Sequence, residues 1–167
     1  MEHEDVLLTL GQIAVTLAAL SGVAGVLAAR PGQTELSAFK IVLLRNVALI
    51  GMVVTVFALL PLTFRGPGIS STSAFRLCSV LALFCGLGGY AFFLPRGREA
   101  LRSGEISAIA FGLGFALNAA AVVLFAWNAI APTLSSSQRY VLGLMCALAI
   151  AGINFIVAVL TPKDPTT

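Results

Sequence analysis

The chain alternates between five long apolar runs and short connections that hold most of its charged and turn-forming residues. Each run is long enough, as a helix rising about 1.5 Å per residue, to cross the roughly 30 Å hydrocarbon core of a bilayer. The pattern therefore predicts an all-α protein, a polytopic membrane helix bundle with five transmembrane helices. We place the helices at about 6–29, 37–62, 74–94, 107–130 and 140–160.

The connections between these runs contain proline and glycine, which are poor in helix interiors. We expect the third helix to stop at Pro95-Arg96-Gly97-Arg98-Glu99, after Leu94. All connections are short, so they leave no room for a soluble domain. Residues 1–167 are thus expected to form a single transmembrane domain, and any function would lie in the membrane or at its two surfaces.

Lys and Arg are unequally divided between the two ends of the predicted bundle. One end holds Arg30, Lys40, Arg96, Arg98, Arg102 and Lys163, and the other holds Arg65, Arg76 and Arg139. Because cytoplasmic loops carry the excess of positive charge, the N-terminus is expected outside and the C-terminus in the cytoplasm. The acidic start also differs from the positive start of a secretory signal, so the first run is expected to remain as a helix. We expect the bacterial cytoplasmic (inner) membrane as the location.

Composition supports lipid as the solvent. The chain is 59% hydrophobic and 10% charged, with a mean hydropathy of +1.01. A soluble domain carries about 25% charged residues. The formal net charge is +3. The basic residues of the chain are scattered at the ends of the apolar runs and do not form one basic face, which argues against nucleic acid as a partner.

Helices two and three resemble helices four and five in sequence. Residues 35–38 read E-L-S-A where residues 105–108 read E-I-S-A, and each stretch opens a helix. In each pair an arginine is followed 13 positions later by a glycine: Arg76 and Gly89, Arg139 and Gly152. This is consistent with a parallel repeat about an axis along the membrane normal. The alternative is chance likeness, since an acid at a helix start suits the helix dipole in any protein.

The chain offers few groups for catalysis. Its single histidine is His3, before the first span, and no Asp or Glu lies within a span. No nucleophile–base pair, phosphate-binding loop or haem-binding histidine pair is present, so we expect no enzyme, no cofactor and no metal site. The Glu2-His3-Glu4-Asp5 cluster could hold a divalent cation, but a solvated acidic terminus is the favoured interpretation.

Arg45 is the one charged residue well within an apolar run. A charge at mid-membrane costs on the order of 3 kcal/mol on the insertion scale, so it needs an explanation. Arg45 either snorkels to the head groups, or is held by polar groups at its own depth, or lines a water-filled cavity that attracts anions. Asn46 and Asn154 fall at a similar depth, and Asn118 lies near the centre of the fourth helix. Together with Arg45 they form the predicted polar site in the membrane.

Small residues recur along the first helix at the spacing of one helix face. They are Gly11, Ala18, Gly22, Gly25 and Ala29. Such ridges let helix backbones approach closely in membranes. This ridge is predicted to pack either within the chain or against another copy.

Two functions are compatible with these features. The first is a channel- or transporter-like membrane protein, a homo-oligomer acting on a small neutral or anionic solute, which rests on Arg45 and the intramembrane amides. The alternative is a non-catalytic accessory or scaffold subunit of a larger membrane complex, which rests on the lack of catalytic groups and of extramembrane mass. In either case the expected partners are the lipid bilayer and further membrane protein.

Overall fold

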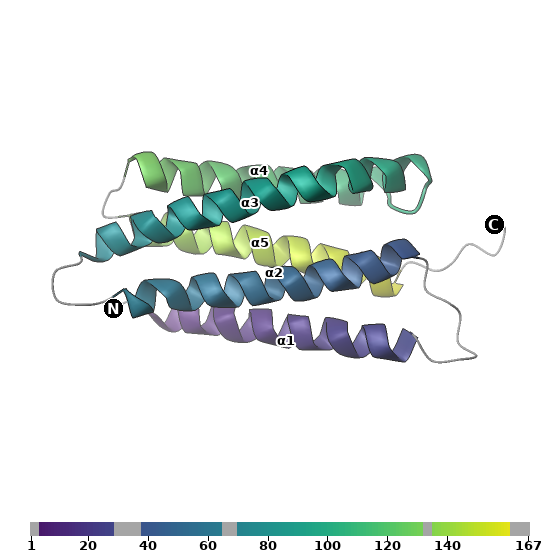
Figure 1. Cartoon of the computed structure of the whole chain (residues 1–167), viewed down its shortest axis with the longest axis horizontal. Coiled ribbons are helices and arrows are strands. Elements are labelled where there is room, and N and C mark those ends of the chain that lie inside the picture. The colour runs from purple at the N-terminus through teal and green to yellow at the C-terminus, as the bar shows by residue number, and fades with distance from the viewer. Residues whose placement is uncertain (1–3, 29–37, 65–69, 132–134, 161–167) are drawn as a thin grey trace.

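The computed structural model describes residues 4–28, 38–64, 70–131 and 135–160, and it is all-helical there. The helices are α1 (Glu4–Ala28), α2 (Ala38–Thr63), α3 (Ser71–Arg102), α4 (Ala108–Ile130) and α5 (Ser136–Leu160) (Figure 1). All five are long and apolar enough to span a membrane. The predicted class and number of helices are therefore confirmed.

The third helix differs most from its prediction. It runs to Arg102, with Pro95 inside it, so the expectation that Pro95 ends the helix is wrong. Helices in membranes tolerate proline where other groups compensate for the lost backbone hydrogen bond. Pro95 removes the donor for the Ala91 carbonyl, four residues before it. In the adjacent turn the Arg96 guanidinium lies 3.8 Å above the Phe92 ring centre and donates a 2.7 Å hydrogen bond to the Phe92 carbonyl.

Serine side chains set the starts of two helices. The Ser70 hydroxyl accepts a hydrogen bond from the Ser73 N–H, and the Ser107 hydroxyl accepts one from the Ala110 N–H. Both are N-cap contacts, which satisfy backbone donors that a helix leaves free in its first turn. They explain why α3 begins a few residues before its predicted start, whereas α4 begins where its sequence indicated.

The helices do not pack in simple chain order. α1 packs along α2, α2 along α5, α5 along α4, and α4 along α3 (Figure 1). By contrast α2 and α3, although consecutive, contact each other sparsely. The α2–α3 pair is thus more loosely packed than the α4–α5 pair to which the sequence likens it.

Packing is tightest between α1 and α2, at Gly51. A Cβ added to Gly51 would lie 2.6 Å from the Ala14 carbonyl oxygen and 2.9 Å from the Ala18 Cβ. Nearby, the Thr55 hydroxyl reaches its own helix at Gly51 O (2.8 Å) and α1 at Gly11 O (3.4 Å). A residue without a side chain is therefore needed at position 51 for this approach.

The main apolar core lies at the end of the bundle where α1, α3 and α5 begin. It includes Leu7, Phe57, Phe75, Phe125 and Tyr140. A smaller cluster of Leu43, Leu44 and Ala158 lies toward the opposite end. Many large apolar side chains instead face outward, among them Val26, Phe84 and Ile109, as expected where lipid replaces water around the bundle.

Candidate functional site

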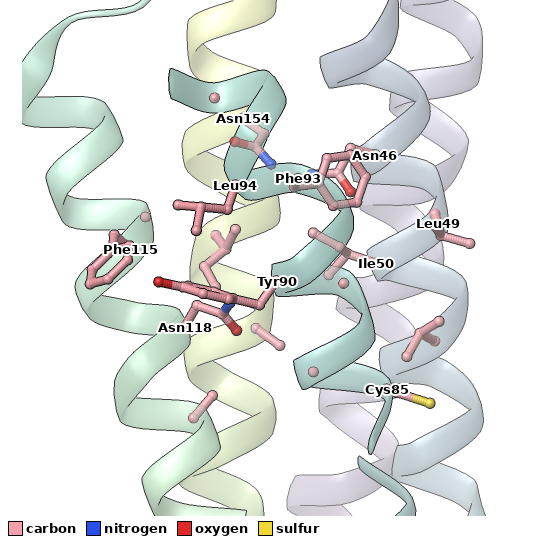
Figure 2. A pocket seen from close by; sticks show the side chains of 18 of the residues that line it. Asn46, Leu49, Ile50, Cys85, Tyr90, Phe93, Leu94, Phe115, Asn118 and Asn154 are labelled. Carbon is pink, nitrogen blue, oxygen red and sulfur yellow. The ribbon is translucent and has the colours of Figure 1, made fainter. Parts of the chain in front are cut away.

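A cavity of about 290 Å³ lies between α2, α3, α4 and α5 (Figure 2). This is many times the roughly 10–15 Å³ of comparable volume that a single water needs. Its wall is mainly apolar. The polar side chains among its lining residues are Asn46, Tyr90, Arg96, Asn118 and Asn154.

The cavity ends against the main core at its deep end. Phe57, Phe125 and Leu144 belong both to the buried core and to the cavity wall. In the other direction the cavity extends to Arg96 and Gly97, near the end of α3. The described lining therefore runs from the end of α3 to the main core and stops short of the opposite end of the bundle.

Asn46 and Asn154 face the cavity at one level, from α2 and α5 (Figure 2). Asn46 is only 7% exposed, and its side-chain oxygen has no hydrogen-bond partner within the described part of the chain. An unpaired buried amide costs about 1–3 kcal/mol. The Asn46 side chain is therefore available to a molecule in the cavity.

Asn118 and Tyr90 form a second polar level, nearer the deep end (Figure 2). The Tyr90 ring lies 5.4 Å from the Phe115 ring, centre to centre, which orients it across the cavity. Residues 4–28, 38–64, 70–131 and 135–160 provide no hydrogen bond to the side chain of Asn118 or Asn154. The cavity thus brings together the three predicted amides, each with an unused donor and acceptor.

Arg45 lies outside this cavity. Its side chain is on the exposed surface of α2, and it makes no hydrogen bond or ion pair with any described residue. Neighbouring residues on a helix point about 100° apart, so Asn46 faces inward while Arg45 faces the lipid side. This placement fits an arginine that snorkels along the surface of the bundle.

The predicted small-residue ridge of α1 divides into two parts. Gly11 and Ala18 face α2, where they meet Ala58 and Gly51. A Cβ added to Gly22 or Gly25 would have no atom within 4 Å from elsewhere in the described chain. Ala29 lies outside the described residues.

Sequence reasoning did not include Tyr90 or Arg96 among the site residues. Both belong to a part of α3 that is rich in glycine, and Gly86, Gly89 and Gly97 also line the cavity. A Cβ added to Gly89 would meet no atom within 4 Å, so this position leaves space, whereas one added to Gly97 would lie 2.7 Å from the Phe111 ring of α4. A cluster of glycines around a single tyrosine in an apolar run was the signal available.

A second polar cluster lies near the opposite end of the bundle. The buried Asn128 amide donates to the Ser79 hydroxyl (2.8 Å) and to the Ser136 carbonyl (3.1 Å). Beside it, Arg76 and Arg139 donate to the Ala129 and Ala131 carbonyls at the end of α4. These contacts tie α3, α4 and α5 together and satisfy the end of a helix, so their role is structural.

The described residues contain no group of three or more His, Cys, Asp or Glu side chains placed to hold a metal ion. Glu2 and His3 of the acidic N-terminal cluster lie outside the described residues. No protein-family model, no curated protein and no solved structure matches this chain. The functional interpretation therefore rests on the residues of the cavity.

Proposed function

We propose that the protein is a non-catalytic, transporter-like integral membrane protein that binds a small neutral solute in the cavity between α2, α3, α4 and α5. The observation that carries this proposal is Asn46, a buried amide that faces the cavity with its oxygen unpaired. Asn118 and Asn154 add two further amides to the same space. Amides bind neutral polar groups because each offers both a donor and an acceptor.

The charges around the cavity favour a neutral solute over an anion. Arg96 is the single charged residue among the described residues that line the cavity. Its guanidinium already contacts the ring and the carbonyl of Phe92. The sequence-based expectation of an anionic solute rested on Arg45, and Arg45 faces away from the cavity.

The cavity also favours a carrier over a continuous pore. The main core closes its deep end, so passage through one chain requires the bundle to rearrange.

We further propose the bacterial cytoplasmic membrane as the location, with the N-terminus outside. In that orientation the end of the cavity near Arg96 lies on the cytoplasmic side. The proposed parallel repeat would relate α2–α3 to α4–α5.

An accessory subunit of a membrane complex is the second candidate, supported by the outer part of α1. Gly22 and Gly25 leave open space beside the helix. Small residues of this kind allow close contact with a helix of another copy or another protein. The same surface would serve a homo-oligomer of the transporter.

Solute flux in proteoliposomes tests the transport proposal. Glycerol serves as a neutral probe, and its uptake is followed by stopped-flow light scattering. We expect the full-length chain to raise glycerol permeability above that of empty liposomes, and the double variant Asn46→Leu/Asn154→Leu to lose most of the increase. Arg45→Leu is the matched control, because it removes a neighbouring polar side chain that lies outside the cavity.

Two results would argue against transport. One is a glycerol permeability equal to that of empty liposomes. The other is an equal loss of flux in Arg45→Leu and in the double amide variant, which would point to a general disturbance of the bundle. Purification of the protein with a stoichiometric membrane partner, without flux, would favour the accessory-subunit alternative.

A further inference from the structure

We propose that the ligand of the cavity is an amphiphile with a neutral, hydroxyl-bearing head group, which reaches Asn46 and Asn154 from the bilayer by passing between α2 and α3. The inference rests on the proposed function, because it names the class of molecule that the same cavity takes. Such an amphiphile differs from a water-soluble solute in two ways: it enters the cavity from the bilayer, and it has an apolar tail.

The first support is a lateral opening. Leu49 on α2 and Cys85 on α3 both line the cavity, and both are exposed on the outside of the bundle. Leu49 is 52% exposed, although part of it belongs to the cavity wall. Because α2 and α3 also contact each other sparsely, the cavity opens to the lipid side between these two helices.

The second support is the depth of the amides. Asn46 follows the start of α2 at Ala38 by eight residues, about 12 Å along a helix. Asn154 precedes the end of α5 at Leu160 by six residues, about 9 Å along a helix. Both amides thus lie below the helix ends, with the deep end of the cavity further into the bilayer.

The third support is the order of polar and apolar groups along the cavity. Asn46 and Asn154 lie toward the end of α3, and Asn118 and Tyr90 form the level below them. The apolar side chains of Phe57, Phe125 and Leu144 form the deep end. An amphiphile standing in one leaflet has the same order, with its head near the surface and its chain toward the centre.

The head group follows from the hydrogen-bonding needs of the amides. The Asn46 oxygen needs a donor, and the amide nitrogens of Asn46 and Asn154 need acceptors. A hydroxyl can do both. A charged head is disfavoured, because Arg96 is held by Phe92 and no other charged residue belongs to the described lining.

Binding of monoacylglycerol to the full-length chain in nanodiscs tests this inference. The probe is a monoacylglycerol with a dibrominated chain, which quenches tryptophan fluorescence at short range. Phe93→Trp, in a Trp127→Phe background, places the fluorophore in the cavity wall. We expect saturable quenching, and about tenfold weaker binding for Asn46→Leu/Asn154→Leu, which removes hydrogen bonds to the head.

Narrowing the lateral opening provides a second, independent variant. Leu49→Phe should slow the onset of quenching severalfold, because it enlarges a side chain at the opening. Val56→Phe is its matched control, since Val56 is a similarly exposed residue of α2 that does not line the cavity. A thermal melt of each variant confirms that the bundle is folded. This arm stays informative if the amide variants fail to fold.

The outcomes separate this inference from the proposed function. Glycerol flux that depends on the amides, without saturable quenching by the brominated monoacylglycerol, would overturn the amphiphile and leave the transporter standing. Absence of both flux and quenching would overturn both. Quenching that is unchanged in the amide and Leu49 variants would show simple partitioning into lipid, and tighter binding of oleate than of monooleoylglycerol would overturn the neutral head.

Discussion

The hydroxyl of Tyr140 on α5 donates a 2.6 Å hydrogen bond to the main-chain carbonyl of Phe57 on α2. Phe57 stands four residues before Pro61, and proline has no N–H, so this carbonyl lacks its usual partner within the helix. Tyr140 and Pro61 are both fully buried. The Tyr140 side chain of α5 thus replaces the hydrogen bond that Pro61 removes from α2. The same contact holds α5 against α2 beside the deep end of the cavity.

Replacing Tyr140 by phenylalanine tests how much this hydrogen bond stabilises the bundle. We expect Tyr140→Phe to lower the free energy of unfolding by about 1–3 kcal/mol, because a buried carbonyl loses its donor. The loss should be smaller in a Pro61→Ala background, where the residue at position 61 supplies an N–H again. Titration of the protein with sodium dodecyl sulfate in mixed micelles, followed by circular dichroism, measures these free energies.

The matched control for this pair is Tyr90→Phe. The structure gives the Tyr90 hydroxyl no hydrogen bond to residues it describes, so its loss should change stability by less than about 0.5 kcal/mol. Equal effects of Tyr140→Phe with and without Pro61 would contradict the proposed role of the hydrogen bond.

Gly51 should be far less tolerant of a side chain than Gly22. Gly51→Ala places a methyl group 2.6 Å from the Ala14 carbonyl oxygen, so α1 and α2 must move apart. We expect a loss of about 1–3 kcal/mol, as for other overpacked contacts. Gly22→Ala meets no atom within 4 Å and should be neutral, or more stable by about 0.5–1 kcal/mol from helix propensity. The same unfolding titration compares them, and equal stabilities of the two variants would contradict the close approach.

The cysteines of α3 should differ sharply in accessibility. Cys85 lines the cavity and is exposed, whereas Cys78 has no exposed surface. A lipid-soluble maleimide added to the protein in liposomes should therefore label Cys85 at least about tenfold faster than Cys78, because reaction at the buried site requires local opening of the bundle. Peptide mass spectrometry measures the two rates. Comparable rates would show that α3 does not keep the packing described.

The position of the polar site was only partly visible in the sequence. Asn46, Asn118 and Asn154 stand out because amides are rare in apolar runs, and the structure places all three on one cavity. Arg45 stands out more strongly but lies elsewhere, on the surface of α2. Arg45 and Asn46 are adjacent, so their side chains point about 100° apart around α2. Because the residues on every side of α2 are apolar, the sequence does not reveal which side faces the other helices.

Five apolar runs determined by themselves that the chain forms five helices suited to a bilayer, because backbone polar groups in lipid must be paired and a helix pairs nearly all of them within itself. Only the tertiary structure decided that α3 continues past Pro95, that Tyr140 completes α2 at Pro61, and that the loose α2–α3 contact leaves a cavity. The physical reason is that hydropathy sets whether a segment enters lipid. The helix faces that pack together are set by the shapes of side chains far apart in the chain. Gly51 permits close contact between α1 and α2, and the glycines of α3 leave space for the cavity.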